Sequence, residues 1–344
     1  MNCRYLCLVP GLTALLFAAQ GQLASNSVAA QSPAGKQTWT VPRTPEGLPD
    51  FQGVWVNNMA TPLERPEALA GRATLTDTEV TAMKKKAHEL FSGQGDAAFG
   101  DSVFDAAFAN VNGVRSGFKS IDGETGDYSS VWTVERDWES RTSLITDPAD
   151  GRMPPMTPEG RRRREASLAA MKQAPAGPED RALQERCITY GSPSLVAGYQ
   201  SAYEIVQTRD TVVLTLEMIH DSRVITLDNR PHLAPSVRQW LGDSRGHWEG
   251  DTLVVDTTNY KPRSFMSRSS EQLHVVERLS RTAPDTLTYQ ITIDDPGTWT
   301  RPWSLMIPLK RADHPMYEYG CHEGNYGMAG ILAGARAEER AGSR

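Results

Sequence analysis

Apolar and polar residues alternate with a period of two through the second half of this chain, and this pattern predicts a β-rich region. Leu287, Tyr289 and Ile291 alternate with Thr288, Gln290 and Thr292, as in a strand with one buried and one solvent-facing side. Runs of this kind are separated by short turns. They predict strands at residues 202–208, 211–219, 224–227, 252–259, 272–281, 286–294, 299–309 and 316–321.

Short connections between consecutive strands predict antiparallel pairing, because a parallel pair needs a long crossover. An earlier strand is predicted at residues 51–57, where Gly53-Val54-Trp55 resembles the G-x-W of lipocalin-like barrels, whose tryptophan plugs one end of the barrel. We therefore expect a mainly β fold with inserted helices, in which an antiparallel meander forms a lipocalin-like barrel or a β-sandwich.

A helical and irregular insertion is predicted at about residues 76–186. Thr76 and Glu79 form a capping box at the start of a helix over residues 76–91. Further helices are expected at residues 157–173, 178–185 and 329–340, whereas residues 92–128 have no clear period and predict a long irregular loop. Residues 31–50 are predicted to be an extended arm, and residues 51–344 a single β-rich domain.

The first 30 residues have the pattern of a cleaved secretory signal peptide. Arg4 precedes an apolar stretch at residues 6–19, and small residues at 28–30 offer a cleavage site. No later stretch approaches the length of a membrane span. We expect a periplasmic or secreted protein without a membrane span, in which the two remaining cysteines, Cys187 and Cys321, form a disulfide.

Composition and net charge limit the classes of molecule that this protein is expected to bind. The 344 residues are 39% hydrophobic and 23% charged, as in an ordinary globular protein, and the formal net charge is −6. Nucleic-acid binding requires clustered Lys and Arg over a broad surface. We therefore expect a small organic ligand or substrate as the partner and no nucleic acid, and the sequence does not predict an oligomeric state.

Residues 238–260 carry the densest set of chemically active side chains, in a turn-rich lead followed by a strand. Two interpretations fit this stretch. It forms part of a binding site, or its Gly, Asp and Ser residues hold a hydrogen-bonded turn cluster.

Two ionisable residues fall on apolar strand faces and are our catalytic candidates. His220 continues the face of Val212, Leu214 and Leu216. Glu277 shares a face of its own strand with Leu273, Val275 and Leu279. A charged group in such a place has a shifted pKa, so we expect His220 to be a general base and Glu277 the acid or orienting carboxylate. The alternatives are a half-exposed His220 and a Glu277 paired with an arginine. Asp221, beside His220, is the third catalytic candidate.

Substrate-binding candidates lie around this pair. Arg223 and Arg238 would hold an anionic or carbonyl oxygen, and tryptophans would line the pocket. The remaining candidates are Trp240, Trp248, Trp303, His232, Glu249, His274 and His322. A zinc site built from His220, His232, His274 and His322 is conceivable, but no short ligand spacing supports it, and we predict no metal or other cofactor.

Several sequence blocks, spread over nearly the whole chain, resemble one known family when taken together. RQWLGDSRGHWEGDTLVVDTTNY, EMIHDSRVI, RTSLITDPADGRMPP and EYGCHEGNYGMAGILAGAR resemble a large family of secreted bacterial proteins of uncharacterised function. The resemblance implies one folded unit and carries no activity. Our leading expectation is a secreted enzyme that applies acid/base side chains to a small molecule by hydrolysis, elimination or isomerisation. The alternatives are a non-catalytic lipocalin-like carrier and a structural or interaction module.

Overall fold

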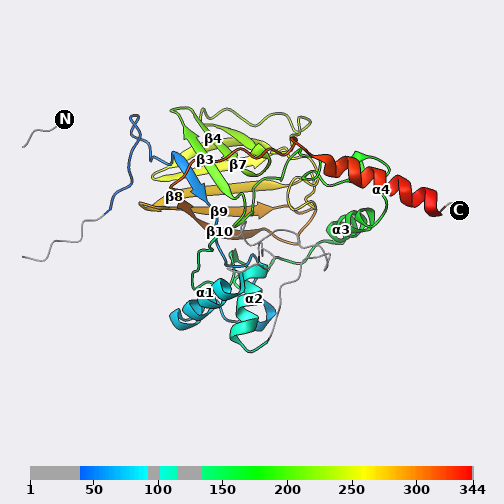
Figure 1. Cartoon of the computed structure of the whole chain (residues 1–344). Coiled ribbons are helices and arrows are strands. Elements are labelled where there is room, and N and C mark those ends of the chain that lie inside the picture. Colours follow the sequence, from blue (N-terminus) through cyan, green and yellow to red (C-terminus); the bar gives the residue numbers. More distant parts are fainter. Residues whose placement is uncertain (1–38, 92–100, 115–133, 343–344) are drawn as a thin grey trace, which may run out of the picture. The chain divides into compact units, whose positions relative to one another are not determined.

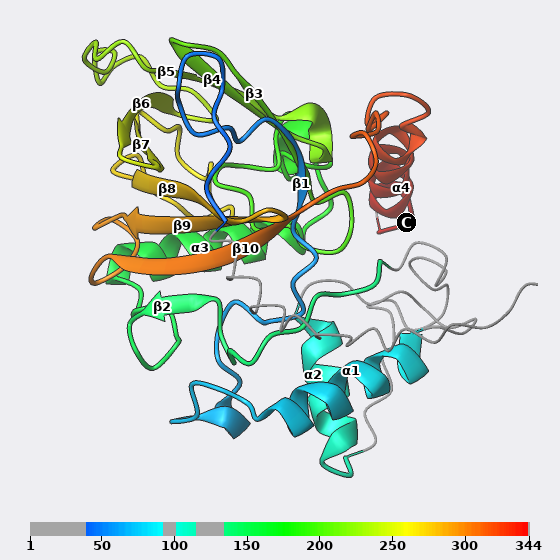
Figure 2. The ribbon, with the colours of Figure 1, turned by 90° about the vertical axis from the view of Figure 1, so that its left-hand side faces the viewer.

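A closed β-barrel dominates the computed structural model, which describes residues 39–91, 101–114 and 134–342 (Figure 1). Figure 2 shows the strands arranged around one ring. Within the described residues, the order around the barrel is β1 (Gly53–Val56), β3 (Ala202–Gln207), β4 (Thr211–Leu216), β5 (Ser222–Thr226), β6 (Asp243–Glu249), β7 (Thr252–Thr258), β8 (His274–Ala283), β9 (Thr286–Asp294) and β10 (Trp303–Arg311), which pairs back to β1. A short strand, β2 (Ile145–Asp147), lies along the first part of β10.

The period-two pattern fills the barrel interior. On β9, Leu287, Tyr289 and Ile291 are almost completely buried, and on β8 the inward positions are Val275, Glu277 and Leu279. Side chains with the opposite parity face outward and remain partly exposed. The expected mainly β fold with inserted helices is confirmed, and of the two expected arrangements the barrel is the one that forms.

One parallel pair interrupts the antiparallel order, which the sequence did not predict. β5 and β6 run parallel, joined by the single bridge Thr226↔Arg245, and residues 227–242 cross from the end of β5 to the start of β6. Strand β6 was missed because its Gly, Ser and Asp residues are typical of turns. Its pairing with β7 from Asp243↔Thr258 to Glu249↔Thr252 stabilises it despite that composition.

The first strand closes one end of the barrel. Trp55 is fully buried, and its indole N–H donates to the main-chain oxygen of Phe51 at 2.8 Å. The guanidinium groups of Arg281 and Arg311 lie 5.4 and 5.5 Å from the centre of the Trp55 ring, within cation–π range. Trp248 packs on Phe51 at the same end, with ring centres 5.2 Å apart.

The insertion contributes a second, smaller core. α1 (Asp77–Phe91) begins at the predicted capping box, where the Glu79 carboxylate accepts the Thr76 N–H at 2.8 Å. Its Met83 and Phe91 pack with Val103 and Phe104 of α2 (Ser102–Val111), a helix inside the stretch predicted as an irregular loop. α3 (Pro158–Met171) begins after Thr157, whose hydroxyl accepts the Gly160 N–H at 2.9 Å.

Other boundaries differ from the sequence prediction. Residues 178–185 contain the 3-10 turn Pro178–Asp180 and no α-helix, residues 316–321 form no strand, and the final helix is α4 (Tyr326–Gly342). The described residues, which begin at Trp39, belong to one compact unit. The predicted signal peptide lies outside the described residues, as do the first residues of the extended arm. Of the helices that the structure describes, none combines the length and apolar character needed to cross a membrane.

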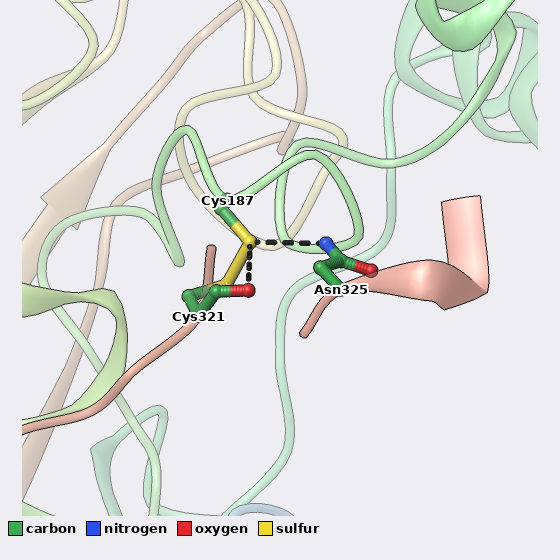
Figure 3. The surroundings of a disulfide bond; sticks show 3 residues. All are labelled: Cys187, Cys321 and Asn325. Carbon is green, nitrogen blue, oxygen red and sulfur yellow. Dashed lines mark hydrogen bonds between the residues drawn. A yellow bond between two sulfur atoms is a disulfide. The ribbon is translucent and has the colours of Figure 1, made fainter. Parts of the chain in front are cut away.

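Cys187 and Cys321 lie at disulfide distance, with their sulfur atoms 2.06 Å apart (Figure 3). Cys187 precedes the first strand of the β-rich half. Cys321 lies in the irregular segment after β10, not in a last strand as predicted. The side-chain amide of Asn325 donates to the Cys187 sulfur at 3.4 Å.

Candidate functional site

The barrel interior contains an ion pair that is almost completely buried. Arg223 on β5 and Glu277 on β8 are 6% and 0% exposed. The two terminal guanidinium nitrogens of Arg223 lie 2.7 and 2.6 Å from the two carboxylate oxygens of Glu277. Both side chains occupy inward positions of their strands, so the barrel closure itself brings them together.

Three tyrosines complete this interior cluster. Tyr289 donates its hydroxyl to the same Glu277 carboxylate, and burial together with that carboxylate holds the pKa of Tyr289 well above its ordinary value. Burial also raises the pKa of Tyr203 and of Tyr260. Burial opposes the charge of Arg223, but the Glu277 carboxylate outweighs it, so the pKa of Arg223 lies above its ordinary value. A buried ion pair seldom stabilises a fold relative to apolar side chains, which makes this cluster a candidate site.

An irregular segment, residues 187–201, closes the barrel end next to this cluster, and we call it the mouth strap. Asp221 accepts the Thr189 hydroxyl at 2.8 Å and the Tyr190 N–H at 2.7 Å. Tyr203 donates its hydroxyl to the main-chain oxygen of Ser194 at 2.7 Å. Beneath the strap, a cavity of about 20 Å³ remains; its lining includes Ser192, Ser194, Tyr203, Arg223 and Tyr289. This volume suffices for about one water molecule.

Gly191 shows how closely the strap packs. Its φ angle is 96°, and a Cβ added there would lie 2.3 Å from the main-chain oxygen of Ser264. Only glycine accepts both the conformation and the approach.

His220 lies outside the barrel interior, which corrects the sequence prediction. Strand β4 ends at Leu216, and the 3-10 turn Met218–His220 directs the following chain away from the apolar face. Ile219 and His220 have φ angles of 61° and 57°, and the His220 side chain is exposed. Its Nε2 accepts the Tyr319 N–H at 3.0 Å. The expected pair of His220 and Glu277 therefore does not share a cavity, although Asp221 and Arg223 line the cavity under the strap.

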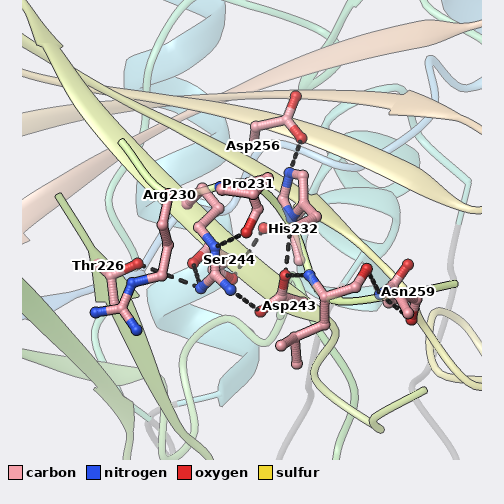
Figure 4. A network of polar contacts seen from close by, with 12 residues as sticks. Thr226, Arg230, Pro231, His232, Asp243, Ser244, Asp256 and Asn259 are labelled. Carbon is pink, nitrogen blue, oxygen red and sulfur yellow. Dashed lines mark hydrogen bonds and ion pairs between the residues drawn. The ribbon is translucent and has the colours of Figure 1, made fainter. Parts of the chain in front are cut away.

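Two other candidate histidines meet on the outer face of the barrel. His232 bridges two carboxylates, with Nδ1 2.9 Å from Asp243 and Nε2 2.8 Å from Asp256 (Figure 4). His274 on β8 places its Nε2 2.8 Å from the second oxygen of Asp256. Its hydrogen bond to Asp256 raises the pKa of His274, and the same bond is the largest cause of the lowered pKa of Asp256.

This outer network holds the crossover of residues 227–242 against the barrel. Arg245 donates to the main-chain oxygen of Pro231 at 3.3 Å, and the Asn259 amide donates to that of Leu233 at 2.9 Å. Arg238 donates to the main-chain oxygens of Tyr260 and Glu271 at 3.2 and 2.7 Å. Of the two interpretations of residues 238–260, the hydrogen-bonded cluster accounts for these contacts, because a parallel β5–β6 pair requires a crossover that must be held.

The remaining candidates are spread over the molecule. Trp240 is partly buried under Lys261, whose amine lies 4.8 Å from its ring centre, and Trp303 is fully buried against Phe265 and Trp299. Trp248 packs at the plugged end. Glu249 pairs with Arg278 on the outer face at 2.7 Å, and His322 is exposed beside Cys321.

The four histidines of the conceivable zinc site do not converge. His232 and His274 share Asp256, whereas His220 and His322 lie in other segments. Among the described residues, no group of three or more His, Cys, Asp or Glu side chains is arranged to hold a metal ion.

Tyr203, Tyr289 and the strap residues Ser192 and Ser194 were not among the sequence candidates. Tyr289 lies on the strand face that the sequence predicts to be buried. A buried tyrosine hydroxyl usually has a hydrogen-bond partner, and this could have identified Tyr289 as a site residue. The sequence carries no comparable signal for Ser192 and Ser194, since the strap's position depends on contacts with segments elsewhere in the chain.

The fold and site together define a closed β-barrel protein with a charged cluster inside and an irregular strap over one end. Comparison of the chain with protein-family models, with curated proteins and with solved structures finds no match.

Proposed function

We propose that this chain is a periplasmic or secreted binding protein for small organic molecules, with its ligand site at the strapped end of the barrel. The observation that carries the proposal is the Arg223–Glu277–Tyr289 cluster, buried beside a small cavity and covered by a segment without regular secondary structure. A small-molecule site typically combines apolar walls with a few convergent polar groups. The predicted signal peptide and the resemblance to secreted bacterial proteins support export.

A carrier accounts for the geometry better than the enzyme with His220 as its base. General acid/base catalysis requires both groups within hydrogen-bond reach of one substrate. His220 is exposed and accepts a main-chain N–H, whereas Glu277 is fully enclosed. The Arg223–Glu277–Tyr289 cluster can bind a ligand without His220.

An enzyme remains the second candidate because of one contact. Tyr289 lines the cavity and donates its hydroxyl to Glu277, so a phenol in the cavity wall is hydrogen-bonded to a carboxylate behind it. In this form of the proposal, Tyr289 is the acid and Glu277 the base, and the reaction is elimination or isomerisation of a small molecule.

Thermal melting with a library of small carboxylates, alcohols and carbonyl compounds tests the binding proposal. A ligand of the native state raises the melting temperature. We expect hits for the wild type and none for the double variant Arg223→Met/Glu277→Leu, which replaces the pair by apolar side chains. The matched control is Arg278→Met/Glu249→Leu, which removes an exposed pair on the outer face. Equal hits for both double variants would refute the site.

The variant Tyr289→Phe separates the two candidates. For a carrier, it changes ligand affinity only modestly. For an enzyme, it abolishes turnover of a bound compound while binding persists, since the transferred proton is lost.

A further inference from the structure

The mouth strap presents its own polar groups to the interior cluster. Ser192 and Ser194 are 3% and 7% exposed and line the same cavity as Tyr203 and Arg223. The two serines come from an irregular segment, whereas Tyr203 and Arg223 come from strands of the barrel wall. One side of this cavity is thus made of a segment outside the barrel wall.

One contact of the strap is a hydrogen bond of the kind a ligand makes. Tyr203 is 1% exposed, and its hydroxyl donates at 2.7 Å to the main-chain oxygen of Ser194. Just beyond, Leu195 and Val196 pack against the barrel core. The strap therefore supplies a carbonyl oxygen, neighbouring hydroxyl groups and a short branched apolar group.

We infer that residues 191–195 of the strap occupy the ligand site as an internal competitor, and that the external ligands are small acyl compounds. This inference rests on the proposed binding function. Such a ligand has a carbonyl or carboxylate oxygen that accepts from Tyr203, beside a hydroxyl or a short apolar group. The ligand binds when the strap moves away from this end of the barrel.

The way the strap is held suits such an exchange. Its first part is anchored by the hydrogen bonds that Thr189 and Tyr190 donate to the Asp221 carboxylate. Burial raises the pKa of Asp221, so keeping this carboxylate ionised costs free energy in the closed position of the strap. Residue 187 is tied to Cys321, which limits how far the strap travels. The opposite end of the barrel is plugged by Trp55 and Trp248, so the ligand enters at the strap.

Hydrogen exchange of the unliganded protein tests whether the strap opens by itself. We compare wild type with Asp221→Ala and with the milder Thr189→Val, and use Asp251→Ala as the control, because Asp251 forms an exposed ion pair with Arg43 far from the strap. Loss of the Asp221 contacts should speed exchange over residues 188–196 by about tenfold while β8 and β9 stay protected. Unchanged strap exchange in both anchor variants would overturn the inference.

Binding of the peptide acetyl-Gly-Ser-Pro-Ser-Leu-amide, a copy of residues 191–195, tests the competition. We expect Thr189→Val and Asp221→Ala to bind it at least about tenfold more tightly than wild type, because the open fraction is larger. Adding Tyr203→Phe to either variant should weaken this binding. No binding to a variant whose strap exchanges quickly would refute the inference.

The two proposals fail separately. Library hits that need Arg223 and Glu277, together with absent peptide binding, leave the binding function and remove the internal competitor. Peptide binding that is insensitive to Tyr203→Phe removes the assigned recognition contact.

Discussion

The guanidinium of Arg223 and the carboxylate of Glu277 face each other through two parallel hydrogen bonds of 2.7 and 2.6 Å across the inside of the barrel. Breaking such a pair leaves one charge buried without a partner. Glu277→Leu should therefore lower the free energy of unfolding by about 3–5 kcal/mol. The double variant Arg223→Met/Glu277→Leu should recover most of that loss, as measured by urea unfolding. A double variant no more stable than the single one would mean that the pair is needed for the fold itself.

The Asp256–His274 contact predicts a dependence of stability on pH. The raised pKa of His274 means that its contribution is present below about pH 6.5 and is lost as the pH rises through its folded-state pKa. The lowered pKa of Asp256 means that its contribution is present above about pH 3.8 and is lost as the pH falls through its folded-state pKa. Both side chains are more than a third exposed, so we expect an effect below about 1 kcal/mol.

Asp256→Asn should flatten the melting-temperature profile on the alkaline side of neutrality. The control is Asp251→Asn, which should leave that part of the profile unchanged. Wild-type and Asp256→Asn profiles that run parallel from pH 6 to pH 8 would contradict the assignment.

Trp248 is a test of which barrel end binds ligand. It packs on Phe51 and is only partly buried, so Trp248→Ala should lower stability by about 2–3 kcal/mol, less than the loss of a fully buried ring. Because the strap lies at the other end, the ligand-induced rise in melting temperature should persist. An unchanged melt without ligand and a lost ligand shift would instead assign the site to Trp248.

The cysteines predict the thiol content of the purified protein. Because Cys187 is paired with Cys321, the two residues should give no free thiol after denaturation without a reductant. Cys187→Ser should lower the stability by about 2–5 kcal/mol, and Cys187→Ser/Cys321→Ser by a similar amount, because both lose the same cross-link. Two titratable thiols in the unreduced wild type would contradict the pairing.

Local signals in the sequence predicted local structure well. The alternation around Tyr289 defined the buried face of β9, and Thr76 with Glu79 defined the start of α1, since both depend on residues a few positions apart. Glu277 was predicted to face an apolar interior, with an arginine as one possible partner, and it does.

Non-local relationships were beyond such patterns. Nothing near Thr226 signals that β5 pairs in parallel with β6, because that pairing depends on where a long connection returns. His220 was misplaced because the predicted strand was extended past Leu216 into a turn. The residues of that turn continue the period-two alternation although they are not in a strand. The contact between Tyr203 and Ser194 depends on how an irregular segment folds back, which periodicity does not describe.

The parallel pair has a mechanical consequence for the barrel. β5 and β6 share one bridge, and β1 and β10 share two, whereas β8 and β9 are paired along nearly their whole length. These two weak seams divide the ring into one half with β1, β3, β4 and β5 and another with β6 to β10. Arg223 belongs to the first half and Glu277 to the second, so their buried pair joins the halves from inside. Thermal fluctuations that separate the halves must therefore first part these two charges.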